Sequence, residues 1–319
     1  MTADQTVTAK GEATAPLGIG SISMRLYPHD LTAREQIAVM RAQAVAAVEA
    51  GYDGVMVSEH HADFPGYLPN PIQICGFLLA VMPRGWAAPC PLLLPMQPYA
   101  LVAEQLAWLD AAYPGRVGAG FASGAVPVDF ELAEVPFDEI RDRFKAALPK
   151  VVAALRGEDP GPLGNDRAMR ARAGSPLPMV AAAQSPAAVR RAARLGIGIL
   201  YDSIQTIETT RRLSDIYDEA GGPGPKILIR RVWIGPPPTD AMEAQMAHFR
   251  TWGNEAAKRN WGDEDSLVHG DTPQEAADKL AEQLRAGGCD TVNVRVHLKG
   301  LTPEQVDEQI ALHAAGFLP

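Results

Sequence analysis

The stretch from Thr32 to His61, TAREQIAVMRAQAVAAVEAGYDGVMVSEHH, contains a helix, a turn and a strand in succession. Thr32 and Glu35 have the spacing of a capping box, which predicts that a helix starts here. Apolar residues then recur at helical spacing, at Ile37, Met40, Ala44 and Val48. The stripe ends at Gly51, and the apolar run GVMVS (54–58) follows. A continuous run of this kind is typical of a parallel strand buried on both faces.

The same alternation continues along the rest of the chain. Capping-box spacing recurs at Thr272 and Thr302, each with proline at the first helical position. Eight apolar runs are predicted strands: Leu17–Ser23, Gly54–Ser58, Pro91–Leu94, Arg116–Gly120, Pro178–Ala182, Ile197–Tyr201, Lys226–Ile234 and Thr291–Val296. Eight strands alternating with helices over about 280 residues favour an α/β fold, a parallel (β/α)8 TIM barrel with insertions between strands. A doubly wound open sheet is the alternative, because the pattern alone does not show closure.

The chain shows no linker that would divide it into two domains. Residues 1–15 have no apolar stretch and are predicted to be a disordered tail. Residues 16–319 are predicted to form a single barrel domain. The proline- and glycine-rich stretch from Gly157 to Gly174 is interpreted as an excursion between the fourth and fifth strands.

The composition excludes several classes of function. The 319 residues are 47% hydrophobic, so a large core can be buried. A formal charge of -9 without a basic cluster argues against nucleic acid or an anionic membrane as partner. The cysteines, Cys75, Cys90 and Cys289, have no CxxC spacing and suggest reduced thiols in a cytoplasmic protein. No apolar run approaches the roughly 18 residues of a membrane span.

A polar cluster, Ser58-Glu59-His60-His61, follows the second predicted strand. In a barrel the reactive groups lie at the carboxyl ends of strands, which is where this cluster falls. Histidine titrates near neutral pH and can move protons there. A lone histidine is more often a hydrogen-bonded structural group, but this position favours a functional one. Because neighbouring strand residues point to opposite sides, His60 and His61 are not both expected to face the barrel axis.

A metal centre is a second hypothesis for the histidines. The chain offers nitrogen and oxygen donors at His29, His60, His61, His269, His297, Asp63 and Asp271. No HxH or HExxH pairing is present, and adjacent histidines rarely chelate one ion. A metal-dependent hydrolase is therefore the weaker reading, and no metal ligands are assigned.

The glycine-rich segment from Gly118 to Gly124 follows a predicted strand and invites comparison with a dinucleotide-binding loop. The segment fails that comparison, because no helix opens at Gly124 and Glu139 lies in a helical pattern instead of at a strand end. Its glycines could still let a flat ring or a phosphate approach the backbone, with a tight strand-to-loop turn as the structural explanation.

A candidate anion site lies at Gln184-Ser185-Pro186, where the chain leaves the fifth predicted strand and enters a helix. Serine at the N-cap and proline at the first helical position leave backbone N–H groups at the positive end of the helix dipole. The same helix carries Arg190, Arg191 and Arg194, which are also consistent with a solvated face.

Taken together, these segments resemble the luciferase-like flavin-dependent monooxygenases. The match is carried by GYDGVMVSEHH (51–61), LLLPMQPYALVAEQLAWLDAAYPGRVGAGFASG (92–124), AAAQSPAAVRRAARLGIGIL (181–200) and residues 268–319. The resemblance implies a barrel that binds reduced FMN at the carboxyl-end cleft and uses O2 to oxygenate a small organic substrate. Leu94, Met96 and Phe121 are expected to line an apolar mouth that excludes water.

Residue by residue, the resemblance implies a role for eight positions. His60 matches the catalytic histidine, and Glu59 matches an acid of the flavin cleft. Cys90 and Pro91 match a pair joined by a cis peptide bond beneath the flavin ring. The flavin phosphate is expected at Ser123, Arg141, Gln184 and Ser185. Ser123 stands where the luciferase pattern has arginine and Gln184 where it has glutamate, which leaves the cofactor open.

Two alternatives therefore accompany the monooxygenase. One is an oxidoreductase of the same family that transfers hydride with an 8-hydroxy-5-deazaflavin coenzyme. The other is a flavin-binding homologue without turnover, against which the retention of Glu59 and His60 argues. The family also implies a homodimer and allows for a separate flavin reductase as partner.

Overall fold

The computed structural model describes residues 14–62, 67–252 and 267–318. All its paired strands are parallel, in the order β3-β2-β1-β10-β8-β7-β6-β5-β4, with β9 beside β8. Their bounds are β1 Ile22–Arg25, β2 Gly54–Val57, β3 Trp86–Pro89, β4 Leu92–Leu93, β5 Ala119–Ala122, β6 Met179–Ala182, β7 Gly198–Leu200, β8 Lys226–Ile234, β9 Leu267–Gly270 and β10 Thr291–Arg295.

The sheet curls into a nearly complete barrel because β3 and β4 are two parts of one barrel strand. β3 pairs with β2 on one side, and β4 pairs with β5 on the other. The Ala87 N–H donates to the Arg116 carbonyl at 3.0 Å, which links β3 to the chain that enters β5. The predicted TIM barrel is thereby confirmed over the open sheet.

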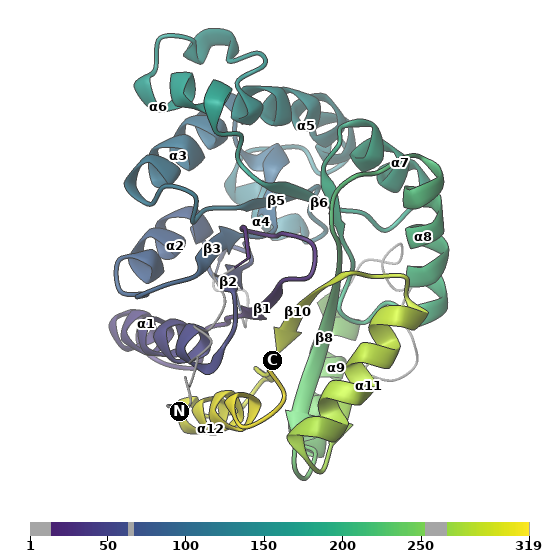
Figure 1. Ribbon diagram of the computed structural model, residues 1–319. Coiled ribbons are helices and arrows are strands. Elements are labelled where there is room, and N and C mark those ends of the chain that lie inside the picture. The colour runs from purple at the N-terminus through teal and green to yellow at the C-terminus, as the bar shows by residue number, and fades with distance from the viewer. Residues whose placement is uncertain (1–13, 63–66, 253–266, 319) are drawn as a thin grey trace, which may run out of the picture.

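Helices surround the strands, as Figure 1 shows: α1, α2, α3 and α5 follow one flank, and α7, α8 and α11 the other. Their bounds are α1 Ala33–Ala50, α2 Pro71–Leu79, α3 Tyr99–Ala112, α4 Pro127–Leu132, α5 Ile140–Arg156, α6 Arg167–Arg170, α7 Pro186–Arg194, α8 Ile207–Glu219, α9 Thr239–Trp252, α11 Pro273–Ala286 and α12 Pro303–Ala314. Within the described ranges, no helix is both long and apolar enough to cross a bilayer.

The predicted helix starts are present. Thr32 and Thr302 each form a complete capping box with the residue three positions on, and the Thr272 side chain accepts from the Glu275 N–H. Ser185 caps α7 by accepting from the Ala188 N–H at 3.3 Å, with Pro186 as the first helical residue. Such caps contribute about 1 kcal/mol each and fix where each helix meets its strand.

Two strand predictions need correction, and two strands were not predicted. The strand expected at Arg116–Gly120 is β5, Ala119–Ala122. The first strand begins at Ile22 and not at Leu17, which has a φ of 57° and packs inside the barrel with Met56 and Trp86. β3 was not predicted, because its sequence WAAP has few β-branched residues. β9 was not predicted either, and it pairs with β8 beside the barrel strands. The stretch from Gly157 to Gly174 does lie between β5 and β6, the fourth and fifth barrel strands, as short helical turns.

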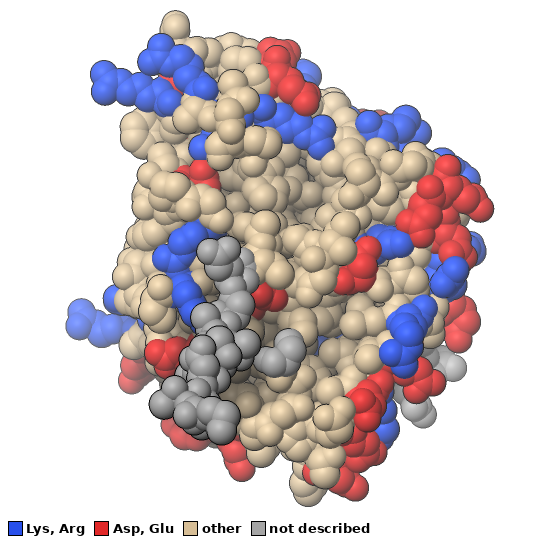
Figure 2. Space-filling model, in the orientation of Figure 1, with Lys and Arg blue, Asp and Glu red and all other residues tan. Residues whose placement is uncertain are grey.

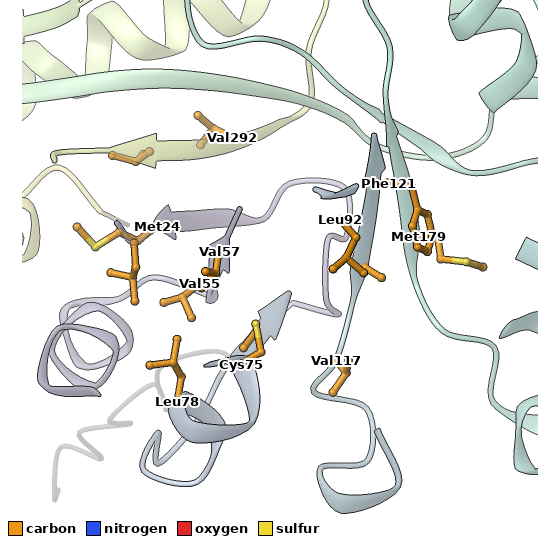
Figure 3. Packing of buried hydrophobic residues seen from close by; sticks show 14 of the residues in the cluster. Met24, Val55, Val57, Cys75, Leu78, Leu92, Val117, Phe121, Met179 and Val292 are labelled. Atoms are coloured by element: carbon orange, nitrogen blue, oxygen red, sulfur yellow. The ribbon is translucent and has the colours of Figure 1, made fainter. Parts of the chain in front are cut away.

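Two apolar layers hold the barrel. In the outer layer, strand residues face the helices, as Val55 and Val57 of β2 do against Cys75 and Leu78 of α2 (Figure 3). The alternate residue Met56 faces inward and joins a smaller cluster inside the barrel. This alternation is the period of two expected of a strand. Polar groups are found instead at the carboxyl ends of the strands.

Of the predicted tail, residues 1–13 lie outside the described residues, and the Thr14 N–H donates to Asp53 Oδ1 at 3.2 Å.

The face shown in Figure 2 carries acidic and basic side chains interspersed along its edge, with uncharged atoms over much of its middle.

Candidate functional site

A cavity of about 840 Å³ opens at the carboxyl ends of the barrel strands. Its wall is built from residues at the ends of strands or shortly after them, such as Arg25 at the end of β1, His60 after β2 and Ser123 after β5. Helices α5, α7 and α8 contribute the outer part of the wall. The cavity is large enough for a cofactor and a small substrate.

Seven of the eight predicted site residues line this cavity: Glu59, His60, Pro91, Ser123, Arg141, Gln184 and Ser185. Cys90 is fully buried and does not line it, but its carbonyl accepts from Arg25 Nη1 at 2.8 Å. The bond between Cys90 and Pro91 is cis, as predicted. The expected mouth of Leu94, Met96 and Phe121 is wrong. Leu94 and Phe121 belong to the outer core, while Leu93, Leu200 and Ile229 supply apolar wall.

Glu59, His60, His61 and Asp129 form a hydrogen-bonded group that we call the histidine corner. His60 Nδ1 lies 2.7 Å from Asp129 Oδ2, and the His61 N–H donates to Asp129 Oδ1 at 2.8 Å. Asp129 is on α4, is fully buried, and stands 69 residues from His60. A buried carboxylate at this distance fixes the orientation of the imidazole, a group that can exchange protons near neutral pH.

Glu59 and His61, the other two residues of the corner, contact each other. His61 Nε2 lies 3.3 Å from Glu59 Oε1, while Glu59 Oε2 accepts from the Leu93 N–H at 2.5 Å. The hydrogen bond to Glu59 raises the pKa of His61, although its partial burial opposes the shift. His61 does not line the cavity, in keeping with the expectation that only one histidine faces it.

The remaining histidines of the metal hypothesis are dispersed. His269 Nε2 lies 2.7 Å from the Gly235 carbonyl, and His29 and His297 both contact Gln43. No group of three potential ligands gathers among the residues that the structure describes, and Asp63 lies outside them.

The opposite side of the cavity carries a group that we call the basic rim: Ser123, Arg141, Ser185, Arg191 and Arg212. The rim includes the N-terminus of α7, where the positive end of the helix dipole favours an anion. Within the described chain, none of its three arginines forms an ion pair with a carboxylate. This donor set fits the phosphate of a flavin nucleotide.

Gln184 donates from Nε2 to Asp202 Oδ2 at 3.2 Å, and both residues line the cavity. A glutamate at position 184 would place two carboxylates together here. The amide avoids that repulsion and explains how this departure from the luciferase pattern is accommodated.

The glycines of the segment 118–124 serve packing first. A Cβ on Gly120 would lie 2.1 Å from Cys90 Sγ, so a neighbouring side chain already fills the space. Gly124 has a φ of 83°, and a Cβ there would lie 2.3 Å from the Phe130 ring. Close packing against Cys90 is thus the explanation at Gly120, and the tight strand-to-loop turn is the explanation at Gly124, which also lines the cavity.

The site also contains five residues that were not predicted from the sequence: Asp129, Arg25, Arg295, Tyr27 and Tyr67. The charged residues had a signal in the sequence. Arg25 and Arg295 each end a strand whose other residues are uncharged, and Asp129 interrupts the apolar segment from Ala125 to Phe130.

Comparison with known proteins agrees with this architecture. The family model of the luciferase-like monooxygenases matches residues 20–318. An F420-dependent glucose-6-phosphate dehydrogenase from Beutenbergia cavernae is 28% identical over 200 residues, which is 59% of this chain. The match spans 56% of that relative, little more than half of its length.

Three solved structures share the fold. A monooxygenase from Streptomyces bottropensis is 22% identical with a TM-score of 0.73, over 93% of this chain and 98% of that one. The oxygenating constituent of 3,6-diketocamphane monooxygenase from Pseudomonas putida, in complex with FMN, is 18% identical with a TM-score of 0.73, over 94% and 98%. An F420-dependent secondary alcohol dehydrogenase is 14% identical with a TM-score of 0.72, over 92% and 98%.

Proposed function

The chain belongs to the luciferase-like monooxygenase family, and from this premise we propose that it uses reduced FMN and O2 to oxygenate a small organic substrate. The observation that carries the proposal is the cavity itself. One end holds the His60–Asp129 pair, and the other holds the basic rim and the N-terminus of α7.

In this proposal the basic rim binds the FMN phosphate. Arg141, Arg191 and Arg212 neutralise its charge, while Ser123 and Ser185 offer hydroxyl groups. Because Ser123 gives neutral contacts where the luciferase pattern has a guanidinium, we expect moderate, micromolar affinity and a protein that purifies colourless.

The bound flavin supplies the redox chemistry, and the protein supplies position, charge and the proton path. His60 exchanges a proton at Nε2 while Asp129 holds its Nδ1 side. Leu93, Leu200 and Ile229 keep the inner wall apolar and limit access of water. Glu59 is expected to contact the flavin from the strand end beside His60, although its two oxygens already contact the Leu93 N–H and His61 Nε2.

The deciding experiment is an anaerobic titration of the apoprotein with FMN and with an 8-hydroxy-5-deazaflavin coenzyme. FMN at a hundred times its Kd should stabilise the fold by about 2.7 kcal/mol, which a thermal shift measures. Unchanged flavin fluorescence and melting temperature up to millimolar FMN would contradict the proposal.

A second candidate function is hydride transfer with the deazaflavin coenzyme. The relative from Beutenbergia cavernae supports it, because its name states dependence on F420. A preference for deazaflavin in the same titration, together with turnover that consumes no O2, would favour this candidate. A homologue without turnover accounts poorly for the oriented His60–Asp129 pair.

The proposed function also implies partners for this chain. A monooxygenase that takes FMN in reduced form requires a supply of it, so we propose a separate flavin reductase. We also propose a cytoplasmic homodimer, to be tested by sedimentation of the purified protein.

A further inference from the structure

Three arginines stand side by side on adjacent strands at the inner end of the cavity. In the register of the sheet, Arg25 of β1 pairs with Arg295 of β10, and Arg295 pairs with Arg231 of β8. Their exposed fractions are 2%, 4% and 1%. Paired residues of parallel strands point to the same side of the sheet, and Arg25 and Arg295 both line the cavity.

The direct pairing of Arg25 with Arg295 is costly without an anion. Like charges on directly paired strand residues repel each other, and buried charges normally pair with an opposite charge. Within the described chain, neither Arg25 nor Arg295 forms an ion pair with a carboxylate. An anionic ligand would therefore give Arg25 and Arg295 an opposite charge, which no described carboxylate supplies.

The two cavity arginines differ in how their hydrogen bonds are used. Arg25 donates to Asn293 Oδ1 at 2.6 Å, to the Cys90 carbonyl at 2.8 Å and to Ser58 Oγ. Arg295 donates to Ser203 Oγ at 3.0 Å, and its buried Nε has no partner in the structure. Arg25 is held in place by neutral groups, whereas Arg295 keeps donor capacity for a ligand.

Aromatic rings enclose this charge. The Arg295 guanidinium lies 4.3 Å from the centre of the Tyr27 ring and 5.7 Å from that of Phe249. Tyr67 packs edge-on against Tyr27 at 5.2 Å and against His60 at 4.5 Å. The rings provide a surface for the apolar part of a ligand, and Tyr67 brings that surface to the catalytic histidine.

We propose that the substrate of this cavity is an organic carboxylate, whose charged group binds Arg295 within the field of Arg25. The inference rests on the proposed function for its chemistry, but not for the binding itself. A planar carboxylate matches the planar fork of a guanidinium. Its hydrocarbon part packs against Tyr27, Tyr67 and Phe249, beside His60. The basic rim on the opposite wall remains for the phosphate of the cofactor.

The test compares benzoate with benzamide, its neutral counterpart of the same shape, by calorimetry on the apoprotein at low salt. Benzoate should bind at least about tenfold tighter, because a charge-assisted pair replaces a neutral hydrogen bond. Equal affinities would overturn the proposal, as would tighter binding of inorganic phosphate than of benzoate at this site.

Variants then locate the binding. Arg295→Gln should remove the preference for benzoate, and Arg295→Lys should keep part of it. Arg190→Gln, on the exposed side of α7, should leave benzoate binding unchanged. If Arg191→Gln removed the preference and Arg295→Gln did not, the carboxylate would bind at the basic rim and the proposal would fail. If Arg295→Gln does not fold, the wild-type protein decides: it should prefer benzoate over benzamide at low salt and lose this preference at high salt.

The two proposals can fail separately. Benzoate binding to an apoprotein that ignores FMN would contradict the proposed function and leave this inference standing. If the protein bound FMN but had equal affinities for benzoate and benzamide, this inference would fail and the proposed function would stand.

Discussion

The histidine corner and the basic rim face the same cavity but are built in opposite ways. In the corner, His60, His61 and Glu59 each have a polar partner within 3.3 Å, and the carboxylate of Asp129 is fully buried. In the rim, Arg141 lies on α5, Arg191 on α7 and Arg212 on α8. None of these arginines pairs with a carboxylate in the described parts of the chain.

The difference shows which region is complete without a ligand. A group whose polar atoms already satisfy each other has a fixed geometry, which proton transfer requires. A set of unpaired cations gains its partner only when an anion binds. Substitutions in the corner should therefore change turnover and stability, whereas substitutions in the rim should change affinity for the cofactor.

The largest effect is expected for His60→Ala. Loss of a general acid–base group lowers turnover by about 10²–10⁴-fold, and FMN affinity should change little because the rim is untouched. Steady-state turnover and an FMN titration measure the two quantities. His61→Ala, outside the cavity, should be milder. Undiminished turnover of the His60 variant with an accepted substrate would remove its assignment.

Asp129→Asn should lower both the stability and the turnover of the protein. The buried carboxylate accepts from two groups of the corner, and leaving a buried group unsatisfied costs about 1–3 kcal/mol. Urea unfolding measures the loss, with Asp138→Asn on the exposed surface as the control. A variant as stable as the control would show that Asp129 is not needed to hold the corner.

The same contrast explains how much of the site could be predicted. Glu59, His60, Gln184 and Ser185 follow strands in the sequence, and barrel closure alone brings such positions together. Asp129 could not be assigned, because 69 residues separate it from His60 and only the return of α4 to β2 joins them. The pairing of Arg25 with Arg295 depends on the contact between the first and last barrel strands, which a local pattern does not contain.

The fold was predicted where the helix and strand periods repeat and missed where they do not. β8 was predicted with its observed bounds, because nine β-prone residues run without interruption. The third barrel strand was only half predicted, since it changes partners between β3 and β4 at Cys90 and Pro91. Propensity describes a residue's own preference, and a change of partner is a property of the closed sheet.

For the rim, Arg191→Gln should weaken FMN binding about tenfold or more, because hydrogen bonds to a charged group contribute about 1.5–3 kcal/mol. Arg190→Gln is the matched control, since it changes the same helix on its exposed side. Turnover at saturating FMN should remain near that of the wild type. Equal FMN affinities of the two variants would show that the rim does not bind the phosphate.

The smallest effect concerns pH and the ion pair between His61 and Glu59. The hydrogen bond to Glu59 raises the pKa of His61 in the folded protein, with further favourable interaction from Glu59 and Asp129 against a cost of burial. A pKa that is higher when folded means that the folded state binds the proton more tightly. The stabilisation is therefore complete below the unfolded value of about 6.5 and is lost as pH rises through the folded pKa.

His61→Asn removes the titrating group and retains a polar side chain. The wild type should exceed this variant in stability most at pH 5.5 to 6, and the excess should shrink steadily towards pH 8.5. Urea midpoints measured across this range for both proteins give the difference directly. A difference that stayed constant or grew with pH would show that the protonated form of His61 is not the one that the corner favours.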